Sequence, residues 1–446
     1  MTTSRTALLG LGILAAFGVG FASASQGTFV IGAFLALALA GFAYAKPQPA
    51  LILWLVVTAV VPYWTTVYVI GVGFPPSAAV GVPVLVGIAT SRFTSGSSVR
   101  LSWMDWSIIS AALIVTFLWW TGELEGFFYI RDLLLVWMLA YVLGRCASGR
   151  VMTAFPVLMA CVAAWGLIEF TFGMHLFADW MPSANHTLNV IQERAGVARS
   201  EAAFGHAIAY GAALVMAIPF AQRLRRHALL VQFLLVAGVA VSLSRGPLLG
   251  LVLTLVLSTW VLADSKLRVR YTLLTVLGGG AAYLILTNLY SGVYSDEVTG
   301  SGNARLDQYF AVRDHLDWLS SALVFSGPNG EPIVAGLLII DSTPLRLAVN
   351  YGIITAALFL IPVAVAALRV LRRKAGPASV ALAGQIPVLL VTSLITQWQM
   401  LIFFMMGVVV TEVLDRRATA ADRDGSSEPL RRSMPYSRQS TVPGRG

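Results

Sequence analysis

The chain has 446 residues, of which 57% are hydrophobic and only 11% are charged. Soluble domains carry about 25% charged residues, so this composition excludes a soluble globular protein and predicts a chain that crosses a membrane several times. The formal net charge is +9, but most basic residues lie in short loops, where they set membrane topology and do not indicate binding to nucleic acid.

Fourteen apolar runs approach the length of about 20 residues that a membrane-spanning helix needs. They cover about residues 6–24, 28–45, 50–71, 77–90, 104–121, 126–144, 151–172, 204–221, 228–243, 247–263, 271–290, 344–367, 378–396 and 399–414. The first run ends in Ala22-Ser-Ala24, which resembles a signal-peptide cleavage site, but its length favours an uncleaved helix. The fourth is short enough to be re-entrant, and the last two are compatible with one kinked hairpin. The expected fold is an all-α polytopic integral membrane protein with about 12–14 transmembrane helices.

Basic residues recur in every second loop if the N-terminus is placed in the cytoplasm, which is the side that basic loops mark. They are Arg5, Lys46, Arg92, Arg100, Arg145, Arg150, the clusters 223–227, 266–270 and 372–374, Arg416 and Arg417. Both termini are therefore expected in the cytoplasm, and the Ser-, Arg- and Pro-rich residues 415–446 are predicted to be a disordered cytoplasmic tail. Scarce lysine beside abundant arginine, alanine and glycine is typical of a GC-rich bacterium, which points to a bacterial plasma membrane.

Arg245 stands between two apolar runs, in Val241-Ser-Leu-Ser-Arg-Gly-Pro-Leu-Leu-Gly250. An arginine in mid-membrane costs about 2.5–3.5 kcal/mol on insertion scales, so Arg245 is expected to lie at an interface, pair with an acid or hold an anion. Pro247 suits the first position of a helix. Arg245 would then stand beside the free N–H groups of a helix start, which is the composition of an anion site.

The other basic residues expected on the outer side are Arg194, Arg199, Arg305 and Arg313. Each either reaches a phospholipid headgroup or serves chemistry, because topology disfavours arginine on that side. Arg199 precedes the predicted helix at 204–221, with Ser200 as its N-cap and Glu201 in its first turn. It either pairs with Glu193 or Glu201 or contacts an anion shared with Arg245. His206 is interpreted as a packed histidine or, alternatively, a base.

A long outer loop is expected over residues 291–343. Its segment 304–324 is predicted to be an amphipathic helix on the membrane surface, because Tyr309, Val312, Leu316, Leu319 and Leu323 fall on one face. Asn303 is its expected N-cap, and Arg305 stands at its start. His315 is interpreted as solvated. Asp341 precedes Ser342, Thr343 and Pro344, so it either helps to cap the next helix or acts as a base or acceptor-binding residue.

Arg131 and Asp132 lie inside an apolar run. Adjacent residues do not share a helix face, so each is expected to find a partner on another helix, or else to line a substrate path. Cys146 and Cys161 suggest neither a disulfide nor a metal site. The sequence shows no glycine-rich nucleotide loop and no metal-ligand spacing, so no cofactor or metal is expected.

Several motifs occur in a characteristic order: Arg199 to His206 with Phe-Gly-His before a helix, Leu243-Ser-Arg-Gly246 in a hairpin, Asn303-Ala-Arg305 in the outer loop, then Gly-Pro-Asn-Gly at 327–330, Ile340-Asp-Ser342 and Asn350-Tyr-Gly-Ile353. In this order they resemble the O-antigen ligase and polymerase superfamily over about residues 190–365. The resemblance divides the chain into transmembrane helices at 1–190, a ligase/polymerase-like core at 191–414 and the tail at 415–446.

This resemblance implies a membrane glycosyltransferase that uses a polyprenyl-diphosphate-linked oligosaccharide on the outer face and needs neither metal nor nucleotide. Arg199, Arg245 and Arg305, with Arg194 beside them, would clamp the diphosphate. Asp341, His315, Glu201 or His206 would activate a hydroxyl of a glycan or lipid acceptor. Ligases of the family have a histidine roughly where Asp341 stands, which favours a polymerase here.

Two other classes of function remain open at this stage. A transporter or flippase of lipid-linked sugar, or of another anionic solute, would place charges in mid-membrane and use broken helices and two similar halves. The pair Arg131-Asp132 favours this class. A structural membrane protein that contacts only lipids and other proteins would leave the set of outer arginines unexplained.

Overall fold

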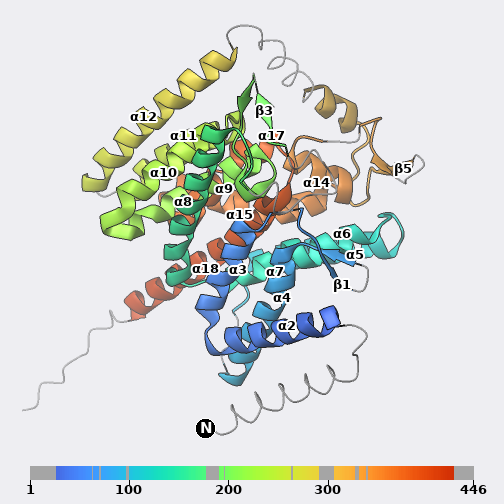
Figure 1. The fold of residues 1–446 in the computed structure, drawn as a ribbon. Helices are drawn as coiled ribbons and strands as arrows, with labels where there is room; N and C mark the ends of the chain where they lie inside the picture. Colours follow the sequence, from blue (N-terminus) through green and yellow to red (C-terminus); the bar gives the residue numbers. More distant parts are fainter. Residues whose placement is uncertain are drawn as a thin grey trace, which may run out of the picture.

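A computed structural model of the chain describes residues 27–62, 64–69, 72–96, 100–176, 190–194, 196–262, 265–290, 306–326, 331–337 and 340–425. Of the residues described, 77% are helical, and the helices form one bundle (Figure 1). Within the described residues, eight apolar helices of 18–24 residues are long enough to cross a membrane, and four shorter apolar helices accompany them. The described residues are therefore mostly helical, with lengths and composition compatible with the predicted all-α polytopic membrane class.

The first half of the chain is a series of helices joined by short connections. Their bounds are α2 (Gly27–Ala45), α3 (Pro47–Val60), α4 (Pro76–Thr94), α5 (Trp103–Trp120), α6 (Phe127–Asp132), a π-helical segment (Leu133–Met138), α7 (Leu139–Arg145) and α8 (Gly149–Phe172). One antiparallel pair of strands, β1 (Val67–Val69) and β2 (Val72–Phe74), lies between α3 and α4.

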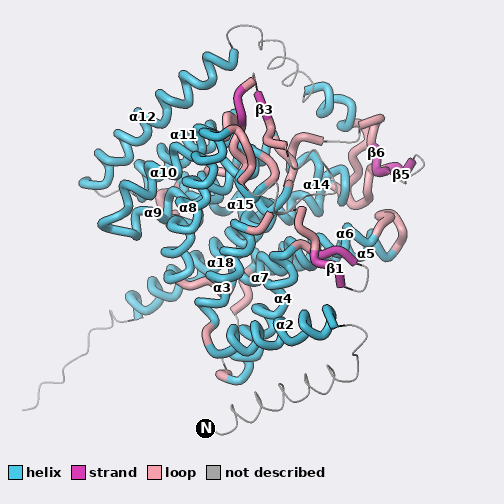
Figure 2. The backbone as a smooth tube through the Cα atoms, in the orientation of Figure 1, coloured by secondary structure: helices cyan, strands magenta, loops and turns pink. Residues whose placement is uncertain are grey.

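The second half contains two further antiparallel strand pairs. These are β3 (Glu193–Arg194) with β4 (Val197–Ala198), and β5 (Val324–Ser326) with β6 (Glu331–Ile333). The helices are α9 (Ala207–Ala221), α10 (Ala228–Val241), α11 (Arg245–Leu257) with a π-helical end (Ser258–Leu262), α12 (Ser265–Tyr290), α14 (Thr343–Tyr351), α15 (Ile353–Leu371), α16 (Pro377–Ala383), α17 (Ile386–Val391) and α18 (Thr396–Gly425). Figure 2 shows strands and loops gathered around β3, α14 and β6.

Helices α9 and α18 form the centre of the bundle. Helix α9 and residues 400–410 of α18 are apolar on every side, and a helix of that kind is stable only when it is enclosed. Accordingly, 78% of the membrane-length window of α9 and 83% of that of α18 are buried. Peripheral helices instead expose large apolar side chains such as Leu35, Leu113 and Phe117, as lipid-facing helices do.

Two glycines allow α7 and α18 to cross with their backbones almost in contact. A Cβ atom built on Gly144 would lie 2.0 Å from the carbonyl oxygen of Phe404, and one on Gly407 would lie 2.2 Å from that of Tyr141. No larger residue fits either position without separating the helices. Small residues at helix crossings are the usual route to close packing in membranes.

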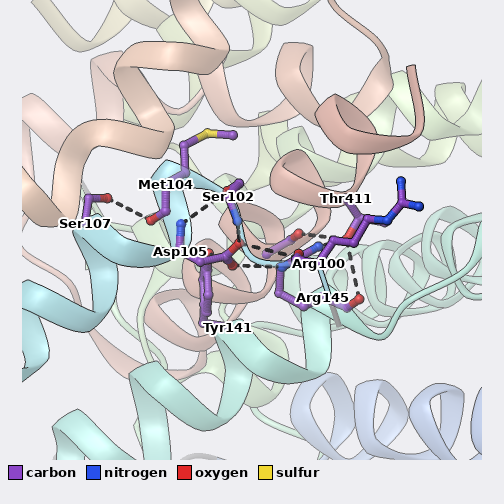
Figure 3. A network of polar contacts seen from close by, with 9 residues as sticks. Arg100, Ser102, Met104, Asp105, Ser107, Tyr141, Arg145 and Thr411 are labelled. Atoms are coloured by element: carbon purple, nitrogen blue, oxygen red, sulfur yellow. Dashed lines mark hydrogen bonds and ion pairs between the residues drawn. The ribbon is translucent and has the colours of Figure 1, made fainter. Parts of the chain in front are cut away.

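A buried ion pair joins α5, α7 and α18 (Figure 3). Asp105 completes a capping box with Ser102 at the start of α5. Its Oδ1 accepts hydrogen bonds from Tyr141 Oη (2.7 Å) and Arg145 Nε (2.9 Å). The Arg145 guanidinium also donates to Thr411 Oγ1 on α18. Each carboxylate oxygen thus has a partner, which offsets the cost of burying the charge.

Replacing Asp105 with alanine is expected to destabilise the protein by about 3–5 kcal/mol, because the nearly buried Arg145 guanidinium loses its counter-ion. Thermal unfolding in detergent measures the effect. The matched control is the double variant Asp105→Leu/Arg145→Met, which removes both charges and should lose much less stability. Equal unfolding temperatures for Asp105→Ala and the wild type would contradict this role of the pair.

Several predicted helices are interrupted in the structure. The run at 344–367 is divided into α14 and α15 at Gly352, whose φ of +86° suits glycine. A Cβ there would lie 2.8 Å from the Trp318 carbonyl oxygen. The run at 378–396 is divided into α16 and α17, and an irregular segment, residues 392–395, separates α17 from α18. The run at 126–144 contains the π-helical segment.

The predicted amphipathic helix at 304–324 is wrong in its second half. Described residues are helical only from 306 to 313. Beyond them, the carbonyl oxygens of Asp317 and Trp318 accept hydrogen bonds from the N–H groups of Ile353 and Ile354, both at 3.0 Å. These carbonyl oxygens accept hydrogen bonds from the first N–H groups of α15, which have no partner within their own helix. The segment is therefore bonded to α15 and does not continue as a helix.

Two helix boundaries also differ from expectation. The helix expected at 204 begins at Ala207, and its N-cap is His206 in place of Ser200. Helix α18 continues to Gly425, so residues 415–425 are helical where a disordered tail was predicted. The predicted helix at 6–24, Asn303, Arg305, the turn at 327–330 and residues 426–446 lie outside the described residues.

Candidate functional site

Helix α14 separates two cavities because its two faces carry different side chains. One face lines a cavity of about 330 Å³, which we call the Arg346 cavity, with Thr343, Arg346, Leu347, Asn350 and Tyr351. The opposite face lines a cavity of about 580 Å³, which we call the Asp341 cavity, with Pro344, Leu345 and Ala348. This short helix thus presents a polar surface to one space and an apolar surface to the other.

The Arg346 cavity combines an aromatic wall with a few placed polar groups. Its aromatic residues are Phe128, Tyr129, Trp137 and Tyr351, and its polar ones include Asp132, Arg346, Asn350 and Gln399. Gln399 Oε1 accepts a hydrogen bond from Trp137 Nε1 at 3.0 Å. Aromatic surface with convergent polar groups is the usual composition of a small-molecule site.

Charged residues of two different helices meet at this cavity. Arg346 Nη1 donates to Ser393 Oγ at 3.1 Å. Asp132 is bound by its own neighbour, since Arg131 Nη2 lies 2.8 Å from Asp132 Oδ1. Arg131 also donates to the Gly73 carbonyl oxygen in β2. We expected each of these residues to find its partner on another helix, and this is wrong for the ion pair, because the two residues pair with each other. Asp132 does line a cavity.

The Asp341 cavity is largely apolar. Its other lining residues are Leu306, Gln308, Tyr309, Ser342, Leu390 and Val391, together with the α14 residues already named. Asp341 is half-buried, and its backbone N–H donates to Gln308 Oε1 at 3.1 Å. Ser342 is the N-cap of α14, and Pro344 lies at its first turn, as predicted. A carboxylate thus stands at the edge of an apolar space.

The end of α17 and the 392–395 segment connect these cavities to the Arg245 stretch. Thr343 Oγ1 donates to the Thr392 carbonyl oxygen at 2.7 Å. A Cβ built on Gly246 would lie 3.2 Å from Val391 Cγ2, so the start of α11 packs against a wall of the Asp341 cavity. The structure therefore brings the start of α11, which holds Arg245, next to the cavity that Asp341 lines.

Arg199 holds the turn that precedes Arg245. The residue is only 8% exposed. Nη2 donates to Ser244 Oγ at 2.7 Å, and Nε donates to the Ser242 carbonyl oxygen at 3.3 Å. Arg199 and the Arg245 stretch are therefore adjacent, as predicted, but these contacts fix the turn and do not by themselves form an anion site.

A buried acidic pair with a histidine lies beneath Arg199. Glu169 accepts hydrogen bonds from the Ala202 N–H (2.8 Å) and contacts His175 Nδ1 (3.1 Å). Glu201 accepts from the Gln192 N–H at 2.9 Å. Burial raises the pKa of Glu201 above its ordinary value, against the hydrogen bond from Gln192 and the nearby His175. Burial would lower the pKa of His175, but the hydrogen bond and charge of Glu169 raise it.

His206 caps the start of α9 through its ring. Its Nδ1 accepts the N–H of Ile208 at 3.1 Å, so in the neutral ring the proton resides on Nε2. Burial and the charge of Arg199 lower the pKa of His206 to about 4, which keeps the ring neutral at pH 7.

Backbone strain is concentrated around the same region. Five described residues other than glycine have positive φ, and three of them are Ala202, Leu243 and Thr396, each at +46°. Ala202 follows Glu201, Leu243 lies inside the Arg199-bound turn, and Thr396 begins α18 beside the Arg346 cavity. Such conformations cost about 1–3 kcal/mol each and cluster at functional sites.

The remaining predicted site residues are not brought to this region by any described contact. His315 is exposed in the outer segment, two residues after the helical stretch 306–313. Arg194 belongs to β3, but its side chain lies outside the described residues, as does the whole of Arg305.

Sequence reasoning missed Arg346, Glu169 and His175. Arg346 lies at the outer end of the run at 344–367, and it could have been found by the argument applied to Arg245, namely an arginine at the outer start of a helix. Glu169 is an acid inside the run at 151–172, which is an equally direct signal.

No protein-family model matches the chain, and neither does a curated protein or a solved structure. The assignment of function therefore depends on the chemistry of these cavities.

Proposed function

We propose that the protein is a membrane glycosyltransferase that polymerises or transfers a polyprenyl-diphosphate-linked glycan on the outer face of a bacterial plasma membrane. The observation that supports it best is the position of α14 between an aromatic, polar cavity and an apolar one. A lipid-linked glycan likewise has a polar part, the sugar, and an apolar part, the hydrocarbon tail. A diphosphate joins the two.

In this proposal each cavity takes the part of the substrate that matches its lining. The sugar that is attached to the diphosphate lies in the Arg346 cavity, against the aromatic wall and the amide groups of Asn350 and Gln399. The polyprenyl tail lies along the Asp341 cavity, whose apolar wall includes Leu345, Leu390 and Val391. The diphosphate then lies at the start of α14, between Arg346 and Arg245.

The reaction is a substitution at the anomeric carbon. The acceptor hydroxyl oxygen forms a bond to the anomeric carbon. The bond between the anomeric carbon and the diphosphate oxygen breaks at the same time, and polyprenyl diphosphate leaves. The guanidinium groups of Arg245 and Arg346 stabilise the negative charge that grows on the leaving group. The hydroxyl proton passes to Asp341, the one half-buried carboxylate at the edge of the Asp341 cavity.

Arg199 is assigned a positioning role. Its guanidinium holds Ser242 and Ser244, and this contact sets the direction in which the next residue, Arg245, leaves the turn. The buried acids Glu169 and Glu201 lie under it and offset its charge within the protein.

A transporter or flippase of lipid-linked sugar is the second candidate. It is favoured by the broken helix at 392–395, the π-helical segment at 133–138 and the Asp132 carboxylate at a cavity between them, because transporters bind substrate at interrupted helices. The two functions differ in whether a glycosidic bond is formed.

The test uses purified protein in liposomes that display a polyprenyl-diphosphate oligosaccharide on the outer leaflet, without nucleotide or added metal. Mass spectrometry of the glycan-lipid should show chains longer by whole repeat units, and the Arg245→Ala variant should lose this product. The matched control is Arg313→Ala, an exposed outer arginine whose side chain is 59% accessible.

Three other outcomes are informative. A single transfer to an added acceptor would identify a ligase. An unchanged glycan that crosses the bilayer would establish the transporter. Full activity in Arg245→Ala, with the protein still in the membrane, would remove Arg245 from the diphosphate clamp.

A further inference from the structure

A second cationic cavity lies at the opposite end of the protein from the candidate site. It has a volume of about 530 Å³ and is lined by Val256, Thr259, Trp260, Arg268, Thr272, Thr275, Val276 and Arg373. Trp260 and Arg245 belong to one helical segment, Arg245–Leu262. At about 1.5 Å of rise per residue, about 22 Å separates them along its axis, most of the thickness of a membrane core.

The lining has the chemistry of a phosphate site. It offers two guanidinium groups and three threonine hydroxyls, and the described lining residues include no carboxylate. Glu412 of α18, which lies beside the turn that follows Arg373, is already bound by the Gly376 and Ala378 N–H groups and by Ser379 Oγ. Nothing acidic in the described lining therefore competes with an incoming anion.

One of the two arginines, Arg373, is fixed in position by its neighbours. The guanidinium carbon of Arg373 lies 5.0 Å from the centre of the Trp260 ring, in a cation–π contact. Its backbone has a φ of +54°, in the left-handed region. The next carbonyl oxygen, of Lys374, accepts hydrogen bonds from Arg369 Nη2 (2.7 Å) and Arg416 Nη1 (2.9 Å), which pins the turn.

An apolar strip continues from the cavity along α12. Val276 lines the cavity, and Leu273, Val276, Leu277 and Leu284 are more than half exposed on this helix. A ligand with a charged head and hydrocarbon chains would satisfy both surfaces. Basic pockets between transmembrane helices on the cytoplasmic side bind anionic lipid headgroups in this way.

We propose that this cavity binds one anionic phospholipid, with its phosphate between Arg268 and Arg373 and its acyl chains along α12. The basic loops at this end make it the cytoplasmic leaflet. The site is separate from the proposed glycan site and does not depend on that function.

The test is native mass spectrometry of the full-length protein in detergent during titration with phosphatidylglycerol. The wild type should keep one tightly bound lipid, and Arg268→Gln/Arg373→Gln should bind it at least 10-fold more weakly. The control, Arg372→Gln/Lys374→Gln, removes the same charge from exposed neighbours that do not line the cavity and should bind like the wild type. Each single variant, Arg268→Gln and Arg373→Gln, should show an intermediate loss.

Three results would overturn the proposal. The first is equal retention of phosphatidylglycerol by the wild type and the Arg268→Gln/Arg373→Gln variant. The second is displacement of the lipid by millimolar inorganic phosphate, which would assign the cavity to the free ion. The third is retention of phosphatidylcholine as tightly as phosphatidylglycerol, because the zwitterionic lipid lacks the net charge that the two arginines recognise.

Discussion

Glycan transfer should fall about 100-fold or more when Arg346 is replaced by glutamine. Arg346 is the arginine that lines the Arg346 cavity, and its Nη1 bond to Ser393 fixes it beside the break before α18. A guanidinium binds a diphosphate oxygen pair through two parallel hydrogen bonds, and losing one such donor to a developing anion typically costs about 10²–10³ in rate. The measurement is the initial rate of product formation in the liposome assay.

The variant Arg346→Lys separates two explanations of that loss. Lysine keeps the charge but not the planar fork, so it should recover only part of the activity. Arg313→Gln supplies the control, because Arg313 pairs with Asp314 at the surface and lines neither cavity flanking α14. Wild-type rates in Arg346→Gln would place the diphosphate elsewhere and leave the Arg346 cavity without its proposed role.

The Asp341→Asn variant should lower the maximal rate by about 10²–10⁴, the range expected when a general base is removed. Asparagine keeps the size of the side chain and its ability to accept hydrogen bonds at the start of α14, so substrate binding should change little. Rates are to be measured over a range of donor concentrations, which separates kcat from KM.

Asp314→Asn is the matched control, since Asp314 is an exposed aspartate of the same outer segment, with a side chain that is 76% accessible. A loss confined to KM in Asp341→Asn would make Asp341 a binding residue. No loss at all would direct the search for a base to Glu201, which is buried and lies next to the Arg199-bound turn.

The positions of the long helices could be predicted because each apolar run must form its backbone hydrogen bonds internally. The points at which these helices are interrupted could not be predicted. Val391-Thr-Ser-Leu-Ile-Thr396 contains neither glycine nor proline and lies in a predicted apolar run, yet residues 392–395 are irregular where distant groups bond to polar atoms at this break. Thr343 binds the Thr392 carbonyl oxygen, and Gln397 Nε2 binds the carbonyl oxygens of Val61 and Ala203. Such partners lie far away in the sequence.

The candidate site was predictable only in part, for the same reason. Arg199 and Arg245 could be associated because both were expected at helix starts on the same side, and the structure places Arg199 against the turn that ends at Arg245. The pairing of Arg131 with Asp132 could not be predicted, because regular helical geometry directs the side chains of neighbouring residues apart. In the structure the two side chains nevertheless reach each other. The division of two cavities by α14 depends on Gly352, whose role as a helix break follows from its contact with Trp318.

The crossing of α7 over α18 sets a condition on any related sequence. At Gly144 and Gly407 the opposing atoms are backbone carbonyl oxygens, which a rotamer change cannot move aside. Leucine, valine and phenylalanine can replace one another along the lipid-facing helices, whereas these two positions admit one residue type each. A distant homologue that shares little else with this chain should therefore still be recognisable by this pair of glycines, one on each of two helices that lie far apart in sequence.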